Sequence, residues 1–194
     1  MANVKLILGS SSPYRRELLD RLGLDYECDS PEINESRLEG ESVEAMVVRL
    51  AEAKARAVAG RHTDALIIGS DQVAVLGEQI LGKPGSHDKA FEQLKQASGQ
   101  FVTFHTGICL YDSRNNTSQI DRIPFAVQFR QLSDEQIEHY LQREQPYNCA
   151  GSFKSEGLGI ALFERMQGED PNALIGLPLI RLISMLETAG LQVL

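Results

Sequence analysis

Three serines and an arginine near the start of the chain form the first group of residues that could do chemistry. Ser10, Ser11 and Ser12 precede Pro13, and Arg15 lies three residues after Ser12. Backbone N–H groups at the start of a helix, together with hydroxyl groups and an arginine, favour a bound phosphate group. The alternative is that Ser12 only caps a helix and that the arginine is solvated. The spacing of a P-loop is absent.

Carboxylates form a second group. Asp71 in "IIGSDQ" directly follows an apolar run that predicts a strand. A carboxylate where a strand gives way to a loop can orient water, accept its proton or bind Mg²⁺; a simple turn aspartate is the alternative. Glu32 and Glu35 lie in the polar segment "PEINE". They could join Asp71 in a metal site, or belong to a solvated acidic loop.

Two lysines and a glycine-rich segment complete the candidates. Lys54 falls on the apolar side of a predicted helix, so it either reaches a pocket or extends along the surface to water. Lys83 precedes Pro84, which restricts its backbone; it could place a charge on a phosphate or be an ordinary turn lysine. Residues 149–160, "CAGSFKSEGLGI", include Glu156. They predict a loop that lines a site, or a plain surface loop.

Taken together, these residues indicate hydrolysis of a phosphoanhydride. The cations and hydroxyl groups suit phosphate, and the carboxylates suit a metal ion and water. A Ser–His–Asp pattern is absent, and no two histidines have the spacing of metal ligands. The three cysteines, Cys28, Cys109 and Cys149, are far apart, so neither a zinc ribbon nor a disulfide framework is supported.

The elements that must position these residues alternate between strands and helices. We expect strands at 4–9, from 65 into a hairpin around Gly77, and at 101–112 and 119–132, the last two as an antiparallel pair. Helices are expected from Pro13 to Gly23 and at 42–60, 86–99, 133–144 and 178–190. Residues 28–36 and much of 149–178 are expected as loops around one strand. The pattern predicts an α/β fold with a mixed, strongly twisted sheet.

Composition limits the class of protein. The chain has 194 residues, of which 42% are hydrophobic and 24% charged, which suits one globular domain over 1–194. The net charge of −8 argues against nucleic acid or anionic lipid as partners. We expect no signal peptide and no membrane span. Scattered cysteines favour a reducing compartment and hence a cytoplasmic location.

Seven short motifs occur in one order along the chain. They read "SSSPYRRELL", "PEINE", "LAEAKA", "IIGSDQV", "GKP", "CAGSFKSEG" and "DPNALIGLPL". In this set the chain resembles the Maf nucleotide pyrophosphatase family, most closely its YceF branch. The resemblance implies an elongated, twisted mixed sheet flanked by helices, with two lobes around a central cleft. It also implies hydrolysis of a nucleoside triphosphate between its α and β phosphates, with a divalent cation, Mg²⁺ or Mn²⁺. The branch prefers 7-methyl-GTP and removes modified nucleotides.

The resemblance also implies roles for single residues. Asp71 matches the catalytic base, and Glu35 and Asp71 match the metal ligands. The phosphate-binding positions are Ser10, Ser12, Arg15, Lys54 and Lys83, and the positions linked to substrate choice are Tyr14, Gln72 and Glu156. One departure concerns the acidic motif, which usually reads Glu-x-Asp-Glu: here Asn34 replaces the aspartate, which keeps an oxygen but loses a charge.

Two of the specificity positions suit a methylated guanine. 7-Methylguanine carries a delocalised positive charge, which an aromatic ring such as Tyr14 attracts. A carboxylate such as Glu156 accepts two N–H groups from the guanine edge, and such charge-assisted bonds are strong. An arginine in place of Tyr14 would repel the cationic base.

Two other functions remain open on the sequence. One is a regulator of cell division, acting on the septum by binding a partner. The other is a phosphatase that releases phosphate rather than pyrophosphate. The expected partner is a small nucleotide, without nucleic acid or membrane, and the family resemblance makes a homodimer plausible.

Overall fold

A computed structural model describes residues 4–194, which form two compact units. The first unit comprises the chain up to Gln72, Thr106–Ile123 and Gly176–Leu194; the second comprises Val73–His105 and Pro124–Ile175. Three long strands pass from one unit into the other, because the unit boundaries fall inside them: β3 (Ala65–Leu76), β5 (Phe101–Asp112) and β6 (Thr117–Phe129).

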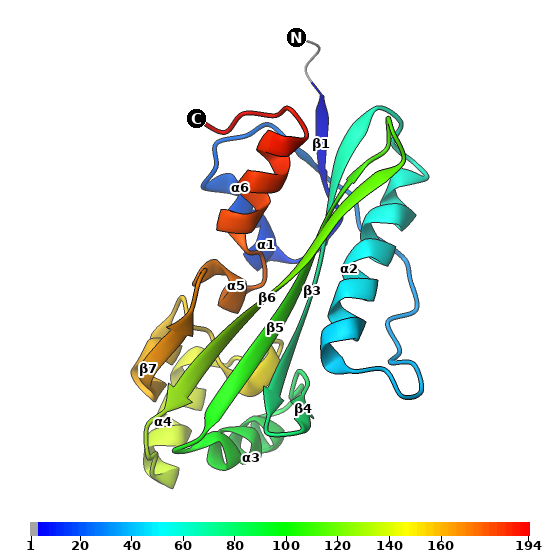
Figure 1. The fold of residues 1–194 in the computed structure, drawn as a ribbon. Helices are drawn as coiled ribbons and strands as arrows, with labels where there is room; N and C mark the ends of the chain where they lie inside the picture. Colours follow the sequence, from blue (N-terminus) through cyan, green and yellow to red (C-terminus); the bar gives the residue numbers. More distant parts are fainter. Residues whose placement is uncertain (1–3) are drawn as a thin grey trace. The chain divides into compact units, whose positions relative to one another are not determined.

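Within residues 4–194, seven strands form a mixed sheet (Figure 1). In the first unit, β1 (Lys5–Leu8) pairs in parallel with both β2 (Glu27–Cys28) and β3. In the second unit, β4 (Gln79–Leu81) and β7 (Phe163–Gly168) pair antiparallel with the later parts of β3 and β6. Residues 113–116 join the neighbouring strands β5 and β6, and so short a connection makes them antiparallel. The predicted α/β class with a mixed sheet is confirmed.

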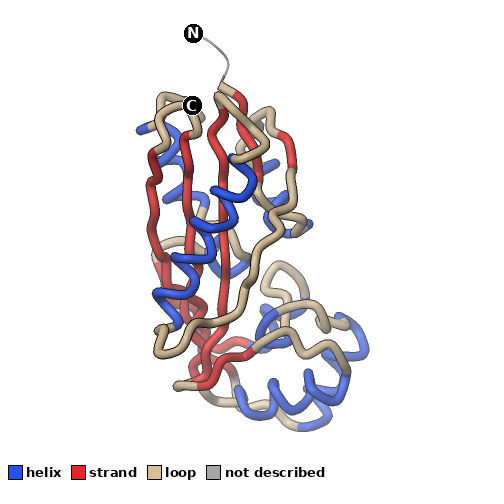
Figure 2. The backbone as a smooth tube through the Cα atoms, turned by 90° about the vertical axis from the view of Figure 1, so that its right-hand side faces the viewer, coloured by secondary structure: helices blue, strands red, loops and turns tan. Residues whose placement is uncertain are grey.

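The helix α2 (Val43–Ala59) covers one face of the first unit's strands (Figures 1 and 2). The predicted cap is present, since the Ser42 side chain accepts a hydrogen bond from the N–H of Ala45. Apolar residues of α2 pack with β1, β3 and β5 in one cluster: Ile7, Ala51, Ala55, Val58, Ala65, Ile67, Cys109 and Tyr111. A Cβ atom at Gly69 or Gly107 would lie 2.1 or 2.2 Å from a backbone oxygen of α2. The two glycines therefore let the helix approach the strands unusually closely.

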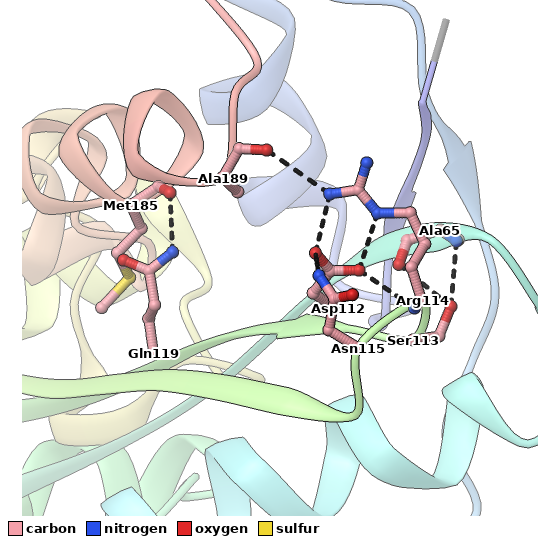
Figure 3. A network of polar contacts seen from close by, with 8 residues as sticks. All are labelled: Ala65, Asp112, Ser113, Arg114, Asn115, Gln119, Met185 and Ala189. Atoms are coloured by element: carbon pink, nitrogen blue, oxygen red, sulfur yellow. Dashed lines mark hydrogen bonds and ion pairs between the residues drawn. The ribbon is translucent and has the colours of Figure 1, made fainter. Parts of the chain in front are cut away.

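The helices α1 (Pro13–Asp20) and α6 (Leu179–Thr188) lie on the opposite side of these strands from α2 (Figure 1). A polar network ties the β5–β6 turn to the C-terminal segment (Figure 3). Arg114 pairs with the Asp112 carboxylate at 2.7 Å and donates to the carbonyl of Ala189. Gln119 donates to the carbonyl of Met185 at 2.8 Å. These contacts hold the turn and α6 in one unit.

The second unit is built around aromatic side chains. Phe104, Phe129, Phe153 and Phe163 meet edge to face, with ring centroids 4.9–5.6 Å apart, an arrangement that aromatic quadrupoles favour. The helices of this unit are α3 (His87–Ala97), α4 (Asp134–Glu144) and α5 (Asn172–Ile175), with 3₁₀ turns at Ala150–Ser152 and Leu158–Leu162. The predicted capping box at the start of α4 joins Ser133 and Gln136. The predicted hairpin at Gly77 is also present, with β3 and β4 paired around it.

The structure differs from the predicted helices and strands in segments where apolar residues do not recur at a regular spacing. Asp71 does not follow its strand: β3 continues to Leu76 because Val73, Ala74 and Val75 are buried in it. Residues 27–28 form the short strand β2 at the edge of the expected loop. The 3₁₀ turns and α5 were not expected, since segments of three to five residues carry too little pattern. That 1–194 acts as one domain, and that a cleft lies between two lobes, stay predictions.

Substituting Gly107→Ala tests the close approach of α2. The new methyl group would collide with the carbonyl of Val47, so we expect a loss of about 1–3 kcal/mol in the free energy of unfolding. Gly60→Ala is the matched control, because its Cβ would meet only the Ala57 oxygen at 3.7 Å. Urea unfolding measures both. Equal stability of the two variants would contradict the packing described here.

Candidate active site

The predicted strand–turn–helix at the start of the chain is confirmed. The strand β1 ends at Leu8, and Pro13 begins α1. Ser12 caps the helix, since its hydroxyl accepts the N–H of Arg15 at 3.4 Å. Ser10 is buried, and its hydroxyl oxygen accepts the N–H of Ser12 at 3.1 Å. The first turn of α1 carries no acidic residue, so the helix end offers N–H groups and positive charge together.

Two hydrogen bonds fix the orientation of the Arg15 guanidinium group. Its Nε donates to the carbonyl oxygen of Gly176 at 2.8 Å, and its Nη1 donates to the Ser10 hydroxyl at 3.4 Å. The Ser70 hydroxyl, which is buried, also lies 2.9 Å from the Gly176 oxygen. Desolvation by burial lowers the pKa of Arg15, while the charges of Asp71 and Glu35 act to raise it. An arginine stays charged in either case.

Lys54 joins the two predicted metal ligands. Its ammonium lies 2.7 Å from the Asp71 carboxylate and 2.9 Å from that of Glu35. The side chains of Lys54 and Asp71 are only 8% and 11% exposed, whereas Glu35 is 59% exposed. Lys54 therefore does not extend to water; it enters a site. Two carboxylates converge there on one cation.

The loop that carries Glu35 is fastened to α2. Arg49 forms a two-pronged ion pair with Glu41, at 2.6 and 2.8 Å, and donates to the carbonyl of Ser36 at 3.2 Å. This bond lowers the pKa of Glu41 to about 2, so the pair stays charged at neutral pH. Asn34, the departure in the acidic motif, accepts the N–H of Ser36 at 2.9 Å. Its side-chain oxygen thus shapes the loop.

The carboxylates fit a divalent cation when phosphate oxygens complete its coordination. Mg²⁺ in nucleotide enzymes is bound through one or two carboxylates plus substrate phosphates and water. Asp71 and Glu35 supply that number, each with a second oxygen beyond the one that Lys54 contacts. Residues 4–194 contain no cluster of three or more His, Cys, Asp or Glu side chains that could hold a metal ion alone.

Comparison with known proteins places the chain in a family. The family model described as "Maf-like protein" matches residues 5–189. The chain belongs to the Maf family. A protein of Nitrosococcus oceani is 60% identical over 97% of this chain and 95% of its own length. Relatives from Alcanivorax borkumensis and Methylobacillus flagellatus are each 58% identical, over 96% and 97% of this chain and 95% and 98% of theirs. All three carry the name 7-methyl-GTP pyrophosphatase.

The other predicted positions of this Maf chain fall in both units. Tyr14 lies half-buried in the first turn of α1, next to Arg15, and Gln72 donates to the Thr106 hydroxyl at 3.1 Å. Lys83 and Glu156 belong to the second unit. Lys83 is exposed in a loop whose next residues are tied down, since Gly85 donates to the carbonyl of Tyr147 at 2.9 Å. The first unit brings the remaining predicted phosphate and metal residues together.

Sequence analysis missed Gly176, whose carbonyl binds Arg15, and Ser70, whose hydroxyl donates to the same carbonyl. Ser70 and Gly176 lie inside the motifs "IIGSDQV" and "DPNALIGLPL", yet neither was given a role. Gly176 acts through its carbonyl oxygen and adopts a φ of +122°, which strongly favours glycine. A glycine directly after the apolar residues of "NALIG" could have indicated a special backbone position, although not the residue that it contacts.

None of the helices in the described part of the chain has the length and apolar character needed to cross a membrane.

Replacing Lys54 tests the charge balance of the site. Lys54→Met leaves the Asp71 carboxylate without its partner, so we expect a loss of about 3 kcal/mol in the free energy of unfolding. The double variant Lys54→Met/Asp71→Asn should recover most of that loss. Lys95→Met is the control, because Lys95 and Asp134 form a surface pair, 51% and 64% exposed, worth about 0–1 kcal/mol. Urea unfolding measures the stability of all variants, including Asp71→Asn alone. If the double variant loses as much stability as Lys54→Met and Asp71→Asn together, the ammonium does not balance the Asp71 carboxylate.

Proposed function

We propose that this Maf protein is a nucleoside triphosphate pyrophosphatase that hydrolyses 7-methyl-GTP to the monophosphate and pyrophosphate. One observation carries the proposal: Lys54 lies between Asp71 and Glu35, at 2.7 and 2.9 Å, and the charges of both carboxylates also act on Arg15 at the start of α1. Two carboxylates and two cations in one place suit a metal–triphosphate complex. The names of close relatives give the substrate. They also support a role in removing modified nucleotides.

The reaction needs a base near the α-phosphate. Asp71 accepts a proton from a water molecule whose oxygen bonds to the α-phosphorus. The bond from that phosphorus to the bridging oxygen breaks, and pyrophosphate leaves with the electron pair. Asp71 suits this role because it is nearly buried and lies on a strand, so its position is rigid. A divalent cation, Mg²⁺ or Mn²⁺, held by Asp71 and Glu35 would neutralise phosphate charge when bound.

The cations of the site neutralise the leaving group. Arg15 keeps its remaining N–H groups for phosphate while Gly176 and Ser10 fix its orientation. Lys54 would add a positive charge to the phosphate-binding region from its place between Asp71 and Glu35. The hydroxyls of Ser10 and Ser12 lie at the same helix start. We carry Lys83 into the proposal as a further phosphate-binding residue, on the family resemblance.

Base choice rests on Tyr14, Gln72 and Glu156 in this proposal. Tyr14 would stack on the cationic 7-methylguanine ring. Glu156 is exposed on a turn, where its carboxylate is free to accept two N–H groups of the guanine edge. Its negative charge also offsets the positive charge that methylation adds to the base. We further propose a single functional domain over 1–194, a cytoplasmic location and a homodimer.

A panel of ordinary and methylated nucleoside triphosphates tests the activity. With Mg²⁺ or Mn²⁺, 7-methyl-GTP should be the best substrate and pyrophosphate the product, and chelation of the metal should abolish turnover. Asp71→Asn should lower kcat by about 10²–10⁴-fold without unfolding the protein. Asp25→Asn, an exposed carboxylate of the same unit, is the control with unchanged rate. Release of phosphate instead of pyrophosphate, or near-normal turnover by Asp71→Asn, would overturn the proposal.

Glu156→Gln tests the choice of base. The amide removes the charge that favours the cationic base, so the ratio of kcat/KM for 7-methyl-GTP over GTP should fall on the order of tenfold. The ratio is measured on one preparation with both substrates. A ratio equal to that of the wild type would show that Glu156 does not select the methylated base.

A further inference from the structure

Glu144 of α4 contacts the turn that carries Glu156 on both sides of that residue. Glu144 is the last residue of that helix, and its side chain is 18% exposed. Its carboxylate accepts the backbone N–H of Leu158 at 2.8 Å. The same carboxylate lies 3.6 Å from the ammonium of Lys154. Glu144 thus contacts the chain two residues before and two residues after Glu156.

The side of the turn before Glu156 has two more fastenings to α4. The backbone N–H of Lys154 donates to the Tyr140 hydroxyl at 3.1 Å. The Lys154 ammonium donates to the backbone carbonyl of Glu144 at 3.2 Å, where a cation suits the negative end of a helix. The side after Glu156 depends on the Glu144 carboxylate for its bond to α4. Removing that carboxylate therefore breaks the bond between α4 and Leu158 and leaves the bond between Tyr140 and Lys154 in place.

Two glycines show how closely the turn is packed. A Cβ at Gly157 would lie 2.9 Å from a Glu144 carboxylate oxygen, and one at Gly159 would lie 2.2 Å from the carbonyl oxygen of Lys154. That carbonyl accepts the N–H of Gly159 at 3.0 Å. The backbone on both sides of Glu156 is therefore restricted. The Glu156 side chain itself is exposed, with the Ser155 hydroxyl 3.4 Å from its carboxylate.

We propose that Glu144 is a positioning residue for base choice: it fixes the turn 154–158 so that the Glu156 carboxylate is presented in one orientation. The inference rests on the proposed function, in which Glu156 accepts N–H groups of the guanine edge. An exposed carboxylate on a mobile turn loses much of its binding energy to ordering, whereas a pre-organised one does not. Two N–H bonds to a flat base edge also require a defined direction.

The experiment compares Glu144→Ala, Glu156→Gln and the double variant on 7-methyl-GTP and GTP. Glu144→Ala should lower the ratio of kcat/KM for 7-methyl-GTP over GTP by roughly fivefold. The double variant should have the ratio of Glu156→Gln alone, because Glu144 acts through Glu156. Glu144→Gln, whose amide oxygen still accepts the Leu158 N–H, should stay within about twofold of the wild type. Glu164→Gln, an exposed carboxylate on β7, is the control with an unchanged ratio.

The ratio of kcat/KM for the two substrates distinguishes a positioning role of Glu144 from a loss of stability and from a failure of the proposed function. Partial unfolding of Glu144→Ala lowers the rate for both substrates equally and leaves their ratio unchanged. An unchanged ratio in Glu144→Ala, with a reduced ratio in Glu156→Gln, would overturn the inference and leave the proposed function intact. A double variant that multiplies the two single effects would also overturn it. A wild-type protein that fails to release pyrophosphate from 7-methyl-GTP would instead contradict the proposed function.

Discussion

A buried lysine between two carboxylates is the interaction on which the first unit depends. Taking the charges of Lys54 and Asp71 out of water costs several kcal/mol each. Their mutual attraction at 2.7 Å, together with the Glu35 carboxylate 2.9 Å from the same ammonium, offsets that cost. A pair of this kind adds little net stability compared with apolar residues, but either member alone is strongly unfavourable. The arrangement is therefore best explained by chemistry rather than by stability. It keeps two carboxylates and a cation together in the geometry that the proposed phosphate chemistry needs.

The close packing of α2 is what makes this arrangement possible. A lysine reaches the centre of a strand only if the helix that carries it lies near the sheet, and Gly69 and Gly107 remove the Cβ atoms that would prevent this. Gly69 stands two residues before Asp71, so one of the two close approaches lies next to the site. On the same strand, Ser70 contacts the Gly176 carbonyl that orients Arg15. Three consecutive residues of β3 thus serve helix packing, bind the carbonyl that orients Arg15, and carry the carboxylate proposed as the base.

Sequence patterns predicted the elements better than the contacts between them. The helix α2 has a long apolar period and a capping serine, and the Ser12-Pro13 start of α1 follows local rules, so both could be found without a structure. The carbonyl of Gly176 contacts Arg15 across 161 residues, and a backbone oxygen leaves no mark on residue types. The contact of Glu144 could not be predicted for the same reason: its carboxylate accepts the backbone N–H of Leu158, and any residue except proline has such a group. The sequence predicts the end of a strand before Asp71 because the polar residues Ser70 and Asp71 interrupt the apolar run. The strand nevertheless continues to Leu76, since the residues that follow are buried in the sheet.

Substrate choice and chemistry place different demands on the residues that carry them. A substitution of Asp71 removes one of the two carboxylate partners of Lys54, whose ammonium is nearly buried. The carboxylate at position 71 therefore cannot be replaced without a cost in stability. Glu156 is exposed on a turn whose backbone is fixed by residues of α4, and substitutions of exposed side chains away from such contacts usually change stability by less than about 0.5 kcal/mol. In the proposed function, a substitution at the tip of this turn would therefore change the choice of base at little cost in stability, provided that the contacts with α4 remain. Glu144 and Tyr140 then belong to the part that must stay, even though neither touches the reacting phosphate in the proposed reaction.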